Sequence, residues 1–210
     1  MSANTYVIVV SIIIISVTVL FSIITFRVIK KELKKSIKAD ISINQMENLE
    51  QKINELLCEN NLMSKYSIEE VAKVLNVECD KNEANFQKQA FVREDKDTGK
   101  KIIIFKRGLS EEEKRFAFVH ELGHIINGDT MPATRPLGKN KDYREQLADY
   151  TAAALLMPKN EVYKYLQDNN YSTGSSKNRV RIVKKLRKQY NVSEMMVLRR
   201  IQEIQILENG

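Results

Sequence analysis

The stretch RFAFVHELGHIINGD, residues 115–129, constrains this chain of 210 residues most strongly, because it holds both of its histidines. Its apolar residues predict a buried α-helix. On a helix, residues four positions apart share one face, so the imidazoles of His120 and His124 can reach a single ion. Two histidines and a glutamate on a buried helix are costly unless they have partners. The pattern therefore indicates a metal site rather than a chance match on a surface helix.

Glu121 completes an H-E-x-x-H motif. A carboxylate at this position can take a proton from a metal-bound water while the water attacks a carbonyl carbon. Gly123 lies inside the same predicted helix, where glycine costs about 1 kcal/mol relative to alanine. We therefore expect another element to pack closely against the helix at Gly123.

The third ligand of the site has to come from elsewhere in the chain. A catalytic zinc usually has three protein ligands, and there is no third histidine. The extended motif that ends in a third histidine is excluded, because Asn127 and Thr130 stand at its glycine and histidine positions. A carboxylate is therefore expected. The nearest downstream candidates are Asp129, Asp142, Glu145 and Asp149.

These carboxylates differ in how easily they reach the histidines. Asp129 would have to fold straight back from the end of the helix. Glu145 and Asp149 are four positions apart on the next predicted helix, residues 140–157, and share a face. One can bind the metal while the other accepts a hydrogen bond from a ligand histidine. The alternative is a solvated acidic face beside Arg144, which the small apolar residues that follow make less favourable.

The remaining patterns predict an α+β fold in which strands precede most of the helices. Helices are expected at residues 45–57, 67–77 and 109–129, the last capped by Ser110 and ended by Gly128. A short antiparallel β-hairpin is expected from residues 85–95 and 100–108, with Gly99 in its turn.

Residues 6–26 form an almost wholly apolar run without a charged side chain. As a helix, 21 residues would span about 31 Å, close to the hydrocarbon core of about 30 Å. A strand would be too long, and a signal peptide would need basic residues before the run and a small-residue cleavage site. Six basic residues and one acidic residue follow in residues 27–38. The positive-inside rule then predicts a single-pass protein of the cell membrane, with the N-terminus outside and the catalytic domain in the cytoplasm.

A second basic segment, residues 177–200, holds nine basic residues and one acidic residue, within a net charge of +7 for the whole chain. Two amphipathic helices joined at YNVS, residues 190–193, give a helix-turn-helix-like outline. Such a segment can meet nucleic acid or anionic lipid, or it can be a structural unit with a solvated basic face. We favour the structural unit, because aromatic interleaving is absent, and nucleic acid is not an expected partner.

Two motifs together resemble the ImmA/IrrE family of metallo-endopeptidases. FAFVHELGHIINGD is followed by YREQLADYTAAALLMP, residues 143–158, and the family pairs HELGH with a later E-x-x-A element, an alanine-rich stretch and LLMP. The resemblance implies a small, mainly helical zincin-like domain that binds Zn²⁺ through His120, His124 and Glu145. It implies Glu121 as the catalytic acid/base, with Asp149 at the position of a usual Asn or Asp behind the ligands. Thr151 replaces the family's usual Phe, which should alter packing and not ligation.

The resemblance covers roughly residues 50–200 and implies cleavage of a regulatory protein such as a helix-turn-helix repressor. A non-catalytic zinc-containing regulatory module and a general membrane quality-control protease are the alternatives. Tyr143 and Tyr150 are near Glu145 in sequence, but neither is assigned as the group that stabilises the oxyanion. The expected organisation is a short N-terminus (1–5), a transmembrane helix (6–26), a basic linker (27–45), a zinc metallopeptidase domain (46–170) and a basic helical segment packed on it (171–210).

Overall fold

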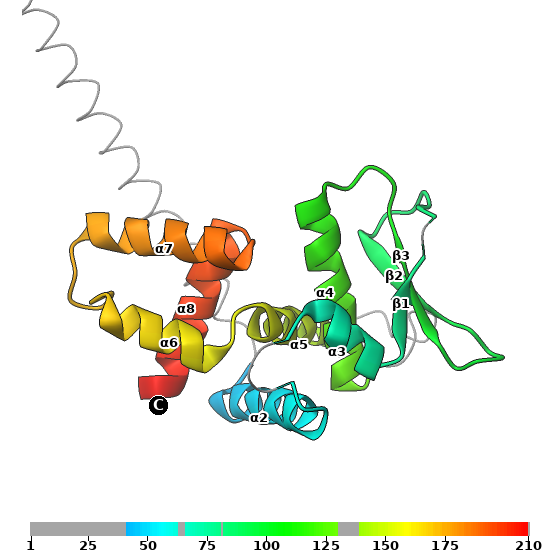
Figure 1. The fold of residues 1–210 in the computed structure, drawn as a ribbon, viewed down its shortest axis with the longest axis horizontal. Coiled ribbons are helices and arrows are strands. Elements are labelled where there is room, and N and C mark those ends of the chain that lie inside the picture. Colours follow the sequence, from blue (N-terminus) through cyan, green and yellow to red (C-terminus); the bar gives the residue numbers. More distant parts are fainter. Residues whose placement is uncertain (1–40, 63–65, 81, 130–138, 210) are drawn as a thin grey trace, which may run out of the picture.

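The computed structural model describes residues 41–62, 66–80, 82–129 and 139–209, without the side chains of residues 139–142. These residues form a mainly helical protein with one small sheet, which confirms the α+β class (Figure 1). The sheet and α4 lie at one end of the molecule, α6 to α8 gather at the other, and α5 runs between them. The helices are α2 (Ile43–Glu59), α3 (Ile68–Val74), α4 (Glu111–Asn127), α5 (Lys139–Leu156), α6 (Lys159–Asp168), α7 (Ser176–Tyr190) and α8 (Glu194–Asn209). The strands are β1 (Val77–Cys79), β2 (Ala90–Glu94) and β3 (Lys101–Phe105).

The sheet contains the predicted hairpin and one strand that was not predicted. β2 and β3 pair antiparallel, with Ala90 opposite Phe105, and Gly99 in the turn between them has a positive φ of 65°. β1 adds to the other edge of β3 in the parallel direction, so the sheet is mixed and not purely antiparallel. The prediction of helix throughout residues 67–77 was wrong at its end, because Asn76 adopts a left-handed conformation (φ 55°) that turns the chain into β1.

The two helices α4 and α5 pack closely against each other. Ser110 caps α4 in a reciprocal pair with Glu113, and Gly128 ends the helix with a left-handed φ of 76°. At the crossing, a Cβ atom on Gly123 would lie only 2.6 Å from the carbonyl oxygen of Ala148. The close packing expected at Gly123 is confirmed, and it brings the ligand candidates of the two helices within reach of one another.

The second half of α5 is the centre of the hydrophobic core. Its alanines, Leu155 and Leu156 are buried against α2, α4 and α8. Thr151 is also fully buried, and its hydroxyl donates a hydrogen bond of 3.1 Å to the side-chain oxygen of Asn127 on α4. Thr151, which stands where the family usually has Phe, therefore packs in the α4–α5 interface and links the two helices by a hydrogen bond.

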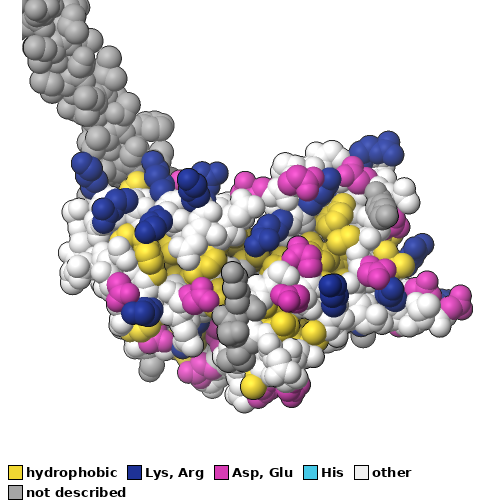
Figure 2. Space-filling model, in the orientation of Figure 1, with side chains coloured by type: hydrophobic (Ala, Val, Ile, Leu, Met, Phe, Trp, Pro, Cys, Tyr) yellow, Lys and Arg dark blue, Asp and Glu magenta, His cyan; other side chains and the backbone are white. Residues whose placement is uncertain are grey.

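The basic C-terminal segment folds as the two expected amphipathic helices, but its charges separate. α7 buries Ile182, Val183 and Leu186 and directs most of its basic residues outward, so Lys and Arg side chains gather over α7 in Figure 2. On α8, Arg200 is fully buried and Arg199 is partly buried. The exposed basic surface of this segment is therefore that of α7 alone.

The predicted localisation at the cell membrane is corrected by the helices of the structure. In the described part of the chain, no helix combines the length and the apolarity that a membrane crossing requires. The 18-residue α5, for example, carries Arg144, Glu145 and Asp149. The apolar run of residues 6–26, on which the single-pass topology depended, lies outside the described residues. The membrane localisation and its orientation are therefore not retained.

Candidate metal centre

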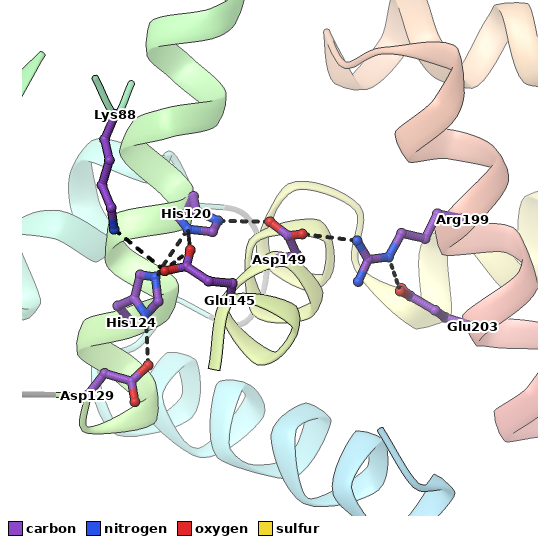
Figure 3. Close-up of polar contacts among 8 residues, drawn as sticks. All are labelled: Lys88, His120, His124, Asp129, Glu145, Asp149, Arg199 and Glu203. Carbon is purple, nitrogen blue, oxygen red and sulfur yellow. Dashed lines mark hydrogen bonds and ion pairs between the residues drawn. The ribbon is translucent and has the colours of Figure 1, made fainter. Parts of the chain in front are cut away.

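His120 and His124 lie one turn apart on α4 and face Glu145 on α5 (Figure 3). The Nε2 atoms of the two imidazoles are 3.1 Å apart. The Oε2 atom of Glu145 lies 3.1 Å from Nε2 of His120 and 3.4 Å from Nε2 of His124. One nitrogen or oxygen of each residue thus lies within 4.8 Å of the others, a spacing that a single metal ion can bridge.

The far nitrogen of each imidazole contacts a carboxylate. Nδ1 of His120 lies 2.8 Å from Oδ1 of Asp149, and Nδ1 of His124 lies 2.7 Å from Oδ2 of Asp129. A carboxylate at Nδ1 favours a proton on that nitrogen and leaves the Nε2 lone pair for a metal. Two such imidazoles and one carboxylate fit the ligand set of a catalytic zinc.

The structure places Asp129 behind His124, and not among the metal ligands for which the sequence made it a candidate. Gly128 reverses the chain after α4, and the Asp129 carboxylate, only 10% exposed, returns to the Nδ1 side of His124. It thus lies behind a candidate ligand and not among the metal-facing atoms. Gly128, the residue that ends the helix in a left-handed conformation, is the sequence feature that indicates this reversal. The side chain of Asp142 lies outside the described residues.

The electrostatics of the cluster favour positive charge. Burial lowers the pKa of His120, but hydrogen bonds to Asp149 and Glu145 outweigh burial and raise this pKa to about 9. The contacts with His120 and then His124 lower the pKa of Glu145. Burial opposes ionisation of Asp149, but His120 and Arg199 lower its pKa overall. Glu145 and Asp149 therefore stay ionised, and without a metal they favour the protonated imidazole of His120.

Arg199 on α8 extends the contacts of Asp149 away from the cluster. Its Nη1 donates to Oδ2 of Asp149 at 3.2 Å, and its Nε donates to Oε1 of Glu203 at 2.9 Å (Figure 3). The sequence had placed Arg199 in a basic surface segment. Glu203 is 4 positions from Arg199 in the chain, whereas Asp149 is 50 positions away. The contact with Asp149 therefore depends on how α8 packs in the fold, which the sequence pattern does not reveal.

Glu121 lines a cleft of about 420 Å³ together with His120 and Glu145. Its side chain is buried, with 5% of the residue exposed. Residues before and at the start of β2 form the other wall of the cleft. From that side Lys88 approaches Glu145, with Nζ 3.6 Å from Oε1, opposite to Asp149 (Figure 3). The cleft thus brings a buried carboxylate, two of the three metal-ligand candidates and a cationic side chain together.

Neither tyrosine considered for the oxyanion lines this cleft. Tyr150 is fully buried and donates a hydrogen bond of 2.8 Å to Glu50 on α2. The hydroxyl of Tyr143 accepts a hydrogen bond from the side-chain amide of Gln45, also on α2. Both hydroxyl groups therefore bind α2.

Comparison with protein families agrees with the geometry of the site. Residues 70–202, more than half of the chain, match the Peptidase_M78 model, which is described as the IrrE N-terminal-like domain. A search of curated proteins found no match. Membership in this family implies a metallopeptidase-type hydrolase with a zincin-like domain that is typically zinc-dependent. The family predicted from the two motifs is confirmed, and the chain belongs to the Peptidase_M78 family, the IrrE N-terminal-like domains.

Proposed function

We propose that the protein is a zinc-dependent endopeptidase in which His120, His124 and Glu145 bind the ion. The observation that carries this proposal is the convergence of two Nε2 atoms and one carboxylate, with a further carboxylate behind each imidazole. A bound zinc would supply Lewis acidity and lower the pKa of its water. Asp149 and Asp129 hold the two imidazole rings in the orientation that this binding needs.

We assign the proton transfers to Glu121. It follows the ligand His120 directly on α4, is buried and lines the cleft. Its carboxylate accepts the proton of the attacking water and passes it to the nitrogen of the leaving amine. Lys88 reaches the cleft from the side of β2, and its ammonium group can stabilise the carbonyl oxygen as negative charge develops.

The substrate that we propose is a regulatory protein, such as a helix-turn-helix repressor, cut at one or two positions. The resemblance to metallo-endopeptidases of the ImmA/IrrE family supports this substrate class. Two other functions remain as alternatives: a non-catalytic zinc-containing regulatory module and a general quality-control protease. The three differ in how many proteins they cut.

The catalytic assignment is tested with Glu121→Gln. This variant should keep one zinc per chain but lose peptide cleavage, because an amide cannot accept the proton of the water. Glu111→Gln, an exposed change on the first turn of α4, is the matched control and should keep both properties. Cleavage that survives Glu121→Gln in zinc-loaded protein would contradict the assignment.

The substrate is tested by comparing protein N-termini in cells that express the wild type or Glu121→Gln. The proposal predicts new N-termini in one or a few regulatory proteins, present only with the wild type. Many new N-termini in unrelated proteins would favour the quality-control protease. No difference, together with an unchanged cellular phenotype, would favour the non-catalytic module.

A further inference from the structure

A second cavity of about 460 Å³ adjoins the cleft of the metal centre. Its size falls within the range of roughly 300–1,000 Å³ that is typical of ligand pockets. The cavity shares Gln89, Phe116 and Asp149 with the cleft, so the two lie side by side. Its apolar wall consists of Phe116, Ala153, Leu156, Val192, Met195 and Met196.

The helices that carry the metal ligands also build this cavity. Phe116 precedes His120 by one turn on the same face of α4, and their ring centroids are 6.0 Å apart. On α5, Ala153 and Leu156 continue the face of Asp149. One helical turn is about 5.4 Å, which is comparable to the spacing of about 6.6 Å between side chains on one side of an extended peptide. An extended chain at the metal centre therefore brings a neighbouring side chain to the cavity.

The interior of the cavity offers apolar contacts. Met195 is 47% exposed, although its side chain is large and apolar. Methionine side chains adapt to apolar groups of different shapes. Of the polar residues at the rim, Asp149 binds Arg199 and Glu113 binds Ser110. The Nε of Arg115 is buried without a hydrogen-bond partner among the described residues. A charged side chain that entered the apolar part, against Leu156, Met195 and Met196, would lose its hydration and meet only apolar groups there.

We propose that this cavity binds a large apolar side chain of the substrate, of the Leu, Met or Phe class, next to the bond that is cut. The inference rests on the proposed function and narrows its substrate class. The substrate is then a protein segment that can become extended and that carries a bulky apolar residue beside the cleavage site. Met196 at the start of α8 and Phe116 on α4 determine the specificity.

Binding can be tested without cleavage by NMR of the methionine methyl groups. Full-length, zinc-loaded Glu121→Gln protein, labelled with ¹³C at these methyls, is titrated with capped hexapeptides of glycine that carry one Phe, Leu, Ala or Asp. The methyl signals of Met195 and Met196 should shift with the Phe and Leu peptides and stay with the Ala and Asp peptides. Met46 and Met157, which are buried in the core, are the internal controls. Unmoved Met195 and Met196 signals, or equal shifts with all four peptides, would overturn the proposal.

Cleavage specificity gives a second, independent test. Wild-type protein should cut the Phe peptide at least about tenfold faster than the Ala peptide, the scale of discrimination that an apolar pocket achieves. Met196→Trp, which fills the cavity, should reduce this ratio about tenfold. Val74→Trp on α3 changes an exposed residue outside the cavity and should leave the ratio unchanged.

The two tests separate the cavity from the catalytic assignment. If zinc-loaded wild type cuts none of the peptides but Met195 and Met196 respond selectively, the proposed protease fails and the apolar site stands. If the peptides are cut without an apolar preference, or Met196→Trp leaves the preference unchanged, the cavity proposal fails and the protease stands.

Discussion

Two groups of charged side chains, the partly buried metal centre and a more deeply buried group, flank α5, and they differ in where the balancing cation comes from. The metal centre has carboxylates around two imidazoles, which can gain or lose a proton. The second group, which we call the Arg200 cluster, consists of Glu50, Tyr150, Arg200 and Glu203. There the fully buried Arg200 forms an ion pair with Glu50, with Nη2 2.7 Å from Oε1, and donates a hydrogen bond of 3.0 Å from Nε to the carbonyl oxygen of Met157.

The two groups differ in whether their cation is part of the chain or can be exchanged with solution. A guanidinium remains charged at all ordinary pH values, so the Arg200 cluster carries a permanent cation within the chain and joins α2, α5 and α8. The metal centre, in our proposal, takes its cation from solution. The Arg200 cluster should therefore govern the stability of the fold, and the metal centre should respond to pH and metal.

The largest effect is expected from Arg200→Met. This change removes the buried cation that pairs with Glu50, and it leaves the 2% exposed Glu203 with Arg199 alone. Breaking a buried pair in this way costs about 3–5 kcal/mol. Urea unfolding should show this loss in the free energy of unfolding. Arg187→Met on the exposed face of α7 is the control and should change it by less than about 0.5 kcal/mol. A loss below about 1 kcal/mol for Arg200→Met would refute the structural role.

The metal-free protein should lose stability as the pH rises from 6.5 to 9. The pKa of His120 is raised from 6.5 to about 9 in the folded state. Its contribution is fully present below pH 6.5 and is lost as the pH passes the folded value. A shift of this size corresponds to at most about 3 kcal/mol. Urea unfolding in the presence of a chelator measures the trend, and the difference between wild type and His120→Gln isolates this residue. A difference that does not shrink toward pH 9 would contradict the expectation.

Gly123→Ala should weaken both the fold and the site. The new Cβ would lie 2.6 Å from a backbone atom of α5, and overpacking of this kind costs about 1–3 kcal/mol. Pushing α4 from α5 also separates the histidines from Glu145, so zinc affinity should fall. Gly174→Ala is the matched control, because its Cβ would meet the Asn170 carbonyl oxygen at 2.6 Å, outside the metal centre. Calorimetric zinc titration should show weaker binding for Gly123→Ala and unchanged binding for Gly174→Ala.

The sequence predicted those features that depend on local pattern. Ser110 and Gly128 mark the ends of α4, and the four-residue spacing of its histidines determines that they share a face. The α4–α5 contact could also be anticipated, because Gly123 is unfavourable inside a helix without a packing reason. The structure brings Glu145 to the histidines and Asp149 to His120, as the two-helix argument required.

The features that the sequence did not reveal depend on distant contacts or on short elements. β1 has three residues, too few for a periodic pattern, and it is stabilised by pairing with β3. Arg199 and Arg200 look like their exposed neighbours on α7, and only the placement of α8 against α5 and α2 distinguishes them. Asp129 was considered only as one of four candidate metal ligands, whereas its position behind His124 follows from the chain reversal at Gly128.

The smallest effect is expected where the two buried groups meet, at Arg199. This side chain contacts both Asp149 of the metal centre and Glu203 of the Arg200 cluster. Loss of a group behind a metal ligand typically costs 10–100-fold in affinity, which we assign to Asp149→Asn. Arg199→Met acts one step further away, so a loss of about tenfold is expected for zinc. If Arg199 acts through Asp149, the double variant should bind zinc no more weakly than Asp149→Asn alone. Additive losses in calorimetric titrations would instead show that the two residues influence the metal centre independently.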